Sequence, residues 1–156
     1  MLLHPDLISI NNNAFFVKGW HEVVNPGDPV YFLFKTPTNV HVHWAYGLLS
    51  DSDVIFQVYH TPTLSDLGTP FTAPNMNLAN DNTHQTLCYA DPTVTSDGTL
   101  VFQTRVGSSK AVGSISAGYL ITGAIDTYYL TKAEKVAAGT GYLDFDFYWV
   151  EDFPER

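Results

Sequence analysis

Two histidines one residue apart are the side chains in this chain best placed for metal chemistry. His41 and His43 lie in a predicted strand, where residues two apart point to the same face. Two imidazoles on one face can bind a metal ion when further ligands complete the site. His60 and His84 are candidate third ligands, but residues 23–133 contain no glutamate. Because this ligand set is incomplete, we expect no metal and no cofactor, and we place both histidines on an outer face.

A second pair, Asp144 and Asp146, lies in an alternating segment at residues 143–151. The two-residue period puts the carboxylates on one face of a strand and large apolar side chains on the other. The apolar set is Leu143, Phe145, Phe147 and Trp149. Paired carboxylates serve glycoside hydrolysis or calcium binding. Outward charge also keeps a terminal strand from pairing edge to edge, and we favour that interpretation.

Other reactive residues lack the surroundings that catalysis needs. The single cysteine, Cys88, lies in a predicted strand, where a buried thiol behaves as a small hydrophobic group. The chain has no Gly-x-Ser-x-Gly nucleophile motif. Residues 107–110 (Gly-Ser-Ser-Lys) match only half of a phosphate-binding loop. We therefore do not expect an enzyme.

The composition argues against several kinds of partner. The 156 residues carry a net charge of −9, from 7 basic and 16 acidic side chains. Nucleic acids and anionic membranes attract clustered cations, whereas the basic residues here are scattered, so we expect neither partner. Residues 1–6 lack the basic region and apolar run of a signal peptide, and no stretch reaches transmembrane length. Hydrophobic residues make up 45%, enough for one sizeable core without disulfides.

Short β-like segments separated by turn residues account for most of the chain. The expected strands cover residues 14–17, 30–34, 40–49, 54–59, 83–90, 99–106, 117–122, 127–131 and 142 onwards. The continuous apolar run at 30–34 indicates a strand buried on both faces. Residues 61–82 form a long connection, and residues 132–138 are the one expected helical turn.

This pattern predicts an all-β fold without βαβ alternation. We expect an antiparallel two-sheet β-sandwich, jelly-roll-like, with an extended N-terminal arm at residues 1–13. Residues 14–156 form a single domain in this prediction, and we find no internal repeat and no linker that would divide them.

Three loops and the final strand follow an order that resembles a known family. They read GTPFTAPNMN at 68–77, DPTVTSDGTL at 91–100, RVGSSKAVG at 105–113 and FYWVE at 147–151. This order is similar to that of the capsid decoration (cement) proteins of tailed bacteriophages, over about the last two thirds of the chain. Two segments depart from the family pattern. Residues 111–113 are less polar than usual, and residues 132–141 look like an insertion or a remade turn.

The resemblance implies a homotrimer that binds the major capsid protein on the capsid exterior and stabilises the head. It also implies a virion protein, made in the bacterial host cytoplasm, with neither catalysis nor cofactor. Loop length and composition suggest where contacts with the capsid or between copies lie. The expected contact residues are Leu2, Leu3, Pro5, Pro70, Phe71, Asn75, Met76, Asn77, Ser108, Ser109 and Lys110.

Three other functions stay open at this point. A carbohydrate-binding or receptor-binding sandwich of a virion needs coplanar exposed aromatic rings, whereas most tryptophans and tyrosines here are expected in the core or at an interface. A cupin-like metalloenzyme would use His41, His43 and His84. A sandwich associated with the phage tail or fibre would share the fold and differ only in its position in the virion.

Overall fold

The computed structural model describes residues 13–23, 25–79, 82–106, 113–116, 121–137 and 141–152. Within these ranges every regular element is a strand, and no helix is long and apolar enough to cross a membrane. The strands are β1 Ala14–Val23, β2 Val30–Lys35, β3 His41–Ser50, β4 Val54–His60, β5 Thr63–Asp66, β6 Thr69–Phe71, β7 Leu87–Ala90, β8 Thr93–Ser96, β9 Thr99–Val106, β10 Gly113–Ser116, β11 Ile121–Thr122, β12 Tyr128–Lys135 and β13 Tyr142–Asp152.

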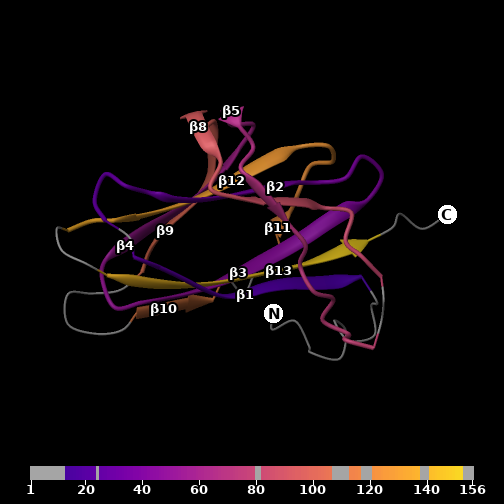
Figure 1. Ribbon diagram of the computed structural model, residues 1–156, viewed down its shortest axis with the longest axis horizontal. Coiled ribbons are helices and arrows are strands. Elements are labelled where there is room, and N and C mark those ends of the chain that lie inside the picture. The colour runs from indigo at the N-terminus through magenta and orange to yellow at the C-terminus, as the bar shows by residue number, and fades with distance from the viewer. Residues whose placement is uncertain are drawn as a thin grey trace.

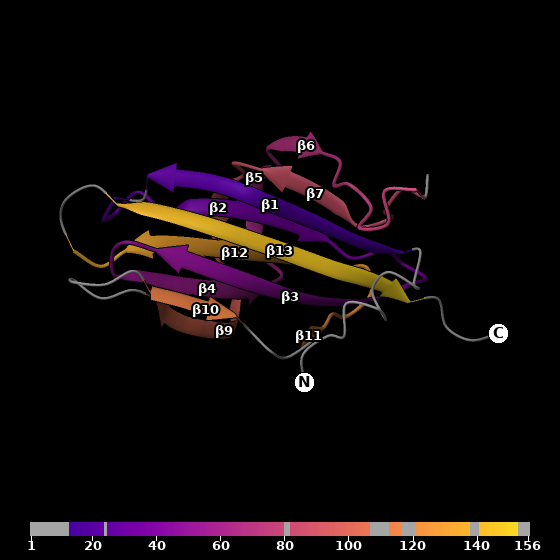
Figure 2. The ribbon, with the colours of Figure 1, turned by 90° about the horizontal axis from the view of Figure 1, so that it is seen from below.

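Two antiparallel sheets lie face to face (Figure 1). The five-stranded sheet has the order β1-β13-β3-β10, with β11 also paired to β3, and it faces the viewer in Figure 2. The six-stranded sheet has the order β6-β7-β2-β12-β4-β9. The predicted all-β, antiparallel two-sheet sandwich is therefore confirmed, while its jelly-roll character stays a prediction.

Aromatic side chains fill the space between the sheets. Phe34 of the six-stranded sheet has its ring centroid 5.1 Å from that of Trp44 and 5.0 Å from that of Phe147, both on the other sheet. On its own sheet, Phe34 stacks on Tyr129 at 5.3 Å. The alternation predicted for β13 is confirmed, because its apolar residues are all buried in this core. They are Leu143, Phe145, Phe147 and Trp149.

The predicted helical turn at residues 132–138 is wrong. Strand β12 continues to Lys135 and is paired on one side with β2 and on the other with β4. Lys132, for example, lies opposite both Tyr31 and Gln57. The Ala-Glu-Lys sequence favours a helix locally, but ladder partners on both sides outweigh a propensity difference of only about 0.5 kcal/mol per residue.

The predicted long connection at residues 61–82 contains two short strands, β5 and β6. The chain leaves β4, passes through β5 and joins the opposite side of the sheet as β6, while β7 continues through β8 to β9. The two connections cross above β2 and β12, and β5 pairs with β8 there (Figure 1). We call residues 61–68 and 91–98 the crossed ribbon. Its two arms have related sequences, so the expectation of no internal repeat is wrong.

The crossed ribbon covers the outer face of the six-stranded sheet. Asp97 in the ribbon accepts hydrogen bonds from Lys132 Nζ at 2.9 Å and from the Tyr31 hydroxyl at 3.4 Å. Leu33 lies two residues from Tyr31 and Leu130 two residues from Lys132, so both leucines lie on this same face. Both are 0% exposed. The prediction that the run at 30–34 is buried on both faces is therefore confirmed for its central residues.

Candidate functional site

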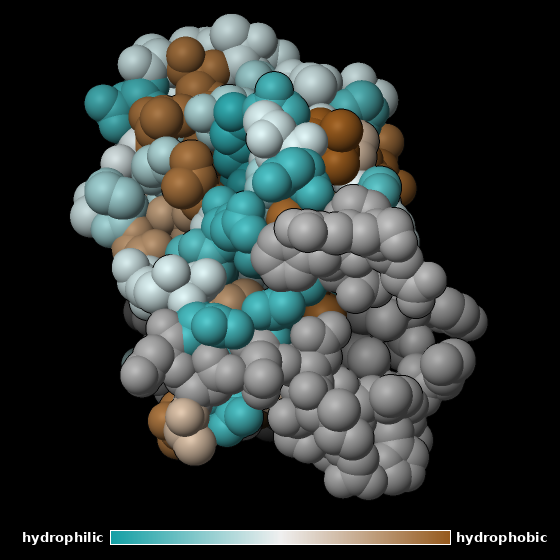
Figure 3. Space-filling view, turned by 90° about the vertical axis from the view of Figure 1, so that its right-hand side faces the viewer, coloured by the Kyte–Doolittle hydropathy of each residue, from teal (hydrophilic) through white to brown (hydrophobic). Residues whose placement is uncertain are grey.

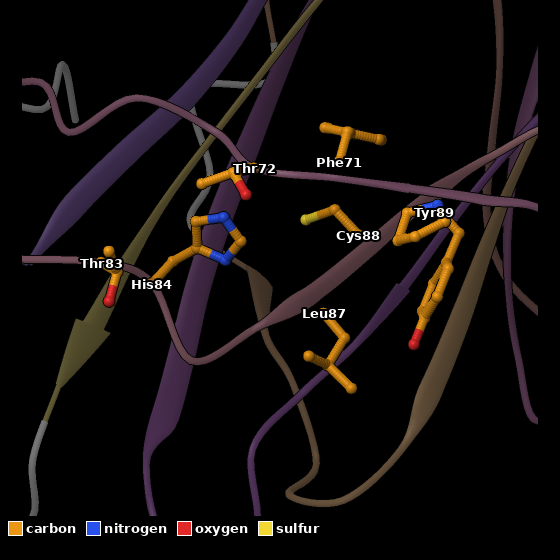
Figure 4. Close-up of a pocket in the computed structure, with 8 residues that line it drawn as sticks. Phe71, Thr72, Thr83, His84, Leu87, Cys88 and Tyr89 are labelled. Carbon is orange, nitrogen blue, oxygen red and sulfur yellow. The ribbon is translucent and has the colours of Figure 1, made fainter.

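A pocket of about 430 Å³ opens beside the crossed ribbon, at the edge of the six-stranded sheet. Strand β6 pairs with β7 only as far as Phe71, which lies opposite Cys88, and the pocket opens where the chain then leaves β7. Figure 4 shows the Cys88 side chain between Phe71 and Leu87, with its sulfur toward the His84 ring. The lining residues are Pro70, Phe71, Thr72, Thr83, His84, Leu87, Cys88 and Tyr89.

The chemical groups that line this pocket favour binding over nucleophilic catalysis. Burial raises the pKa of the Cys88 thiol to about 12, and the nearby Glu151 carboxylate adds to the rise. The thiol therefore stays protonated at neutral pH, where it is a poor nucleophile. His84 accepts a hydrogen bond from the Ala73 amide at 2.9 Å through Nε2, and its Nδ1 donates to the Thr86 carbonyl. With both ring nitrogens engaged, the pocket suits an apolar group of a partner.

A buried carboxylate holds the far wall of the pocket in place. Glu151 is 2% exposed, and its oxygens accept hydrogen bonds from the amides of Gln85 at 2.9 Å and Thr86 at 2.7 Å. The Thr86 hydroxyl donates to a Glu151 oxygen at 2.7 Å, and the Trp149 indole N–H donates to the same carboxylate at 3.3 Å. Because every one of these partners is a donor, the carboxylate is matched in its ionised form. It fixes residues 85–86 against β13 and makes the pocket wall rigid.

Sequence reasoning missed Glu151, although a signal for it was present. The inward positions of β13 recur every two residues, and the residue two beyond Trp149 is Glu151. A carboxylate that falls on the inward face of a strand has to find donors there, since an unpaired buried charge is very costly. The alternation thus predicts a buried, hydrogen-bonded carboxylate at this position.

Of the predicted contact residues at 70–77, two line this pocket and the other three belong to the loop that follows β6. Pro70 and Phe71 line it directly. Asn75 is 8% exposed and has a structural role, because its side-chain oxygen accepts from the Asn77 amide at 2.8 Å. The Met76 amide donates to the carbonyl of Ala14 at 2.8 Å, which ties this loop to β1, and the Met76 side chain is 40% exposed.

The other predicted contacts lie outside the described residues. This applies to Leu2, Leu3 and Pro5 in the arm, and to Ser108, Ser109 and Lys110. Only Asn13 of the predicted arm is described, and its carbonyl accepts a hydrogen bond from the Glu151 amide at 3.0 Å.

The three candidate metal-binding histidines do not come together. His41 is exposed, and His43 lies 2.9 Å from the Thr122 hydroxyl on the outer face of the five-stranded sheet. The His84 ring instead packs edge-on against Trp149 and Phe15, on the inner side of that sheet. Among the described residues, no three His, Cys, Asp or Glu side chains are grouped closely enough to hold a metal ion.

The two aspartates of β13 face outward, as the alternation predicts, but not for the predicted reason. Asp144 and Asp146 are half-buried between core-facing neighbours. However, β13 is paired with β1 on one side and β3 on the other, so it is an interior strand with no edge to protect. Charge from Asp146 adds to the burial that raises the pKa of Tyr148, consistent with a shared outer face.

The two tryptophans whose side chains the structure describes are inside the protein, whereas several tyrosines are partly exposed. Trp44 is 0% exposed and Trp149 is 1% exposed, so neither can stack on a sugar ring. Exposed apolar side chains are instead scattered, with Leu78 at 83% and Tyr142 at 58%. In the coloured part of Figure 3, hydrophobic side chains lie in separate groups among hydrophilic ones.

Comparison of the chain with protein-family models, with curated proteins and with solved structures finds no match.

Proposed function

We propose that this protein is a structural protein of a tailed-phage virion, a capsid decoration protein that binds the capsid exterior and stabilises the head. One observation carries the proposal. Two of the loop segments that resemble the decoration family, residues 68–77 and 91–100, meet in space. Gly68 packs against the backbone of residues 90–92, and both segments pass through the crossed ribbon or line the adjacent pocket.

The properties of this region suit a clamp on another protein. The crossed ribbon projects from the outer face of the sheet (Figure 1) and rests on fully buried leucines. A preorganised projection loses little conformational entropy when it binds. The adjacent pocket can accept an apolar side chain of the partner, and contacts of this kind dominate the affinity of many interfaces. The chain's charge of −9 suits a basic partner surface.

The direct test is binding to expanded, undecorated capsids of the phage that encodes the protein. The purified chain is mixed with these capsids, and the bound fraction is measured by sedimentation over a range of concentrations. The proposal expects saturable binding and a capsid that resists heat at a higher temperature when decorated. Absence of binding, with capsids that are intact by electron microscopy, contradicts the proposal.

The proposal includes a homotrimer, because a trimer makes three copies of each weak contact at once. Size exclusion with light scattering measures the native mass. A mass of about three chains supports assembly before capsid binding. A monomer in solution moves trimer formation to the capsid surface, and decorated capsids viewed by electron microscopy then show whether the copies cluster in threes.

A further inference from the structure

The crossed ribbon has an internal two-fold symmetry in its sequence and backbone, and this symmetry includes the exposed pair Thr63 and Thr93. One arm reads Tyr-His-Thr-Pro-Thr-Leu-Ser-Asp-Leu-Gly-Thr from residue 59, and the other reads Tyr-Ala-Asp-Pro-Thr-Val-Thr-Ser-Asp-Gly-Thr from residue 89. Tyrosine, proline, threonine and glycine recur at matching positions. The offset between the arms is 30 residues.

The backbone of the two arms follows the same symmetry. Both arms begin with a residue of positive φ, Thr61 at 52° and Asp91 at 53°. Both arms end with a glycine of positive φ, Gly68 at 86° and Gly98 at 93°. Each of these glycines packs against the start of the other arm, Gly68 on residues 90–92 and Gly98 on residues 60–62.

Strand pairing places the two-fold axis between Leu64 and Val94. These residues are paired, while Thr63 pairs with Ser96 and Asp66 pairs with Thr93, which are equivalent pairs under a two-fold rotation. The intervening residues bulge and donate equivalent hydrogen bonds. The Ser65 hydroxyl donates to the Thr93 carbonyl at 3.5 Å, and the Thr95 hydroxyl donates to the Thr63 carbonyl at 2.9 Å.

The sheet beneath the ribbon obeys the same axis. Leu33 and Leu130 are paired with each other and flanked by Tyr89 and Tyr59 respectively. Two residues after each leucine, a lysine lies over a tyrosine ring. Lys35 is 5.3 Å from the centroid of Tyr128, and Lys132 is 5.9 Å from that of Tyr31. The ion pairs of the two lysines do not follow the axis, since Lys132 pairs with Asp97 of the ribbon at 2.9 Å, whereas Lys35 pairs at 2.7 Å with Asp126, outside the ribbon.

Matching residues inside the protein are explained by folding, but matching residues outside are not. Thr63 and Thr93 are identical and exposed, and neither side chain is needed for the hydrogen bonds between the arms. The match is not general, because the exposed residues Thr61 and Asp66 of one arm correspond to Asp91 and Ser96 of the other. Substitutions at such surface positions usually change stability by less than about 0.5 kcal/mol, so stability alone does not keep Thr63 and Thr93 alike. Two identical exposed threonines, held in equivalent positions on one rigid element, offer a symmetric partner the same contact twice.

We propose that the crossed ribbon binds across two identical segments of the partner, one from each of two partner subunits related by a local two-fold axis. This inference rests on the proposed function, in which those subunits are neighbouring capsid proteins. A two-fold interface matches the same patch twice, so each arm contacts one subunit around its matching threonine, Thr63 or Thr93. In a trimer, each protomer places its own ribbon across one such pair.

The exposed groups of the ribbon define the chemistry of the partner segment. Residues 61–69 and 91–99 contain hydroxyls and carboxylates but no lysine or arginine. Asp97 is already paired with Lys132, whereas Asp66 and Asp91 are exposed. Each partner segment is therefore expected to present hydrogen-bonding groups together with a lysine or arginine side chain, which meets Asp66 on one arm and Asp91, at a different position, on the other.

A matched pair of substitutions tests this inference on the full chain. Thr63→Lys and Thr93→Lys place a positive charge, of the same sign as the one expected on the partner, at the same position of the two arms. Tyr142→Lys is the control, since Tyr142 is exposed on the five-stranded sheet. Affinity is measured by sedimentation with expanded, undecorated capsids. Each single substitution is expected to weaken binding about tenfold and the double substitution about a hundredfold, because independent contacts add. The control changes affinity less than twofold.

Cross-linking keeps the test decisive if a lysine variant does not fold. Thr63→Cys and Thr93→Cys are made separately with Cys88→Ala, and each is labelled with a thiol-reactive photo-cross-linker and bound to the same capsids. Attachment to the same capsid peptide from both positions supports the inference. Attachment from one position only, or to different peptides, overturns it, as does a loss of affinity in only one lysine variant. Unchanged binding of both lysine variants overturns it and leaves the proposed function standing. Failure of the unaltered protein to bind refutes the proposed function, and this inference with it.

Discussion

The two faces of the six-stranded sheet are both buried, but by different means. On the inner face, Phe34 packs against Trp44 and Phe147 of the opposite sheet. On the outer face, Leu33 and Leu130 are covered by the crossed ribbon, which is made from the sheet's own connections. The comparison shows that short connections can close the second face of a sheet without another layer. The cover is small, rigid and projecting, and its upper surface is free to meet a partner.

The inner face is expected to show the largest effect of a single substitution. Phe34→Ala removes a fully buried ring that contacts other rings on both sheets. We expect a loss of about 3–5 kcal/mol in the free energy of unfolding, from lost burial and the cavity left behind. Urea unfolding followed by tryptophan fluorescence measures it. A loss below about 1 kcal/mol would mean that the rings are not closely packed.

The outer face is expected to be nearly as sensitive, and equally so on its two halves. Leu33→Ala and Leu130→Ala each leave a cavity under the crossed ribbon. We expect each to lower the free energy of unfolding by about 2–4 kcal/mol. Because the two leucines are related by the two-fold axis, their losses should agree to within about 1 kcal/mol. If both substitutions cost almost nothing, the ribbon is a loose cover and cannot act as a rigid binding element.

The glycines of the crossed ribbon offer a smaller effect with a built-in control. Gly68→Ala and Gly98→Ala require a side chain at positive φ and push a Cβ into the carbonyls of Ala90 and His60. We expect each to cost about 2–3 kcal/mol. Gly27 also has positive φ, at 76°, but open space around it. Gly27→Ala should therefore cost only about 1 kcal/mol. Equal losses at all three positions would contradict the close approach of the two arms.

The smallest effect is a pH dependence that comes from the inner side of the pocket. Burial raises the pKa of Cys88 to about 12 in the folded protein. Below the thiol's ordinary pKa of about 8.5 the thiol is protonated in both the folded and the unfolded protein, so ionisation of Cys88 costs no stability there. Above it the unfolded chain ionises first, and stability is lost by up to about 1.4 kcal/mol per pH unit towards pH 12. Between pH 8 and pH 10 the wild type should therefore lose more stability than Cys88→Ala. Parallel losses in the two proteins would mean that the thiol is accessible to water.

Much of the sandwich could be predicted because its signals are local. The period of two in β13 correctly assigns Phe145, Phe147 and Trp149 to the core. The uninterrupted apolar run in β2 correctly indicates burial on both faces, although nothing local says what covers the outer one. The helical turn was wrong because Lys132 and its neighbours have ladder partners on both sides, which a propensity argument does not see.

The crossed ribbon and the pocket could not be predicted in the same way. The two arms repeat in the sequence without a gap at an offset of 30 residues, but the repeat alone does not show that the arms cross and pair with each other. The pocket depends on where β6 leaves β7 at Phe71, a position set by contacts with other segments. The separation of His84 from His41 follows from which sheet face each residue reaches, and spacing alone does not determine it.

Hydrogen–deuterium exchange of the free and the capsid-bound protein tests the central claim most directly. If the crossed ribbon binds across two identical partner segments, the amides of residues 61–69 and 91–99 gain protection together and to a similar extent. The amides of β13, on the opposite sheet, should change little. Protection confined to one arm, or found only outside the ribbon, would contradict the account.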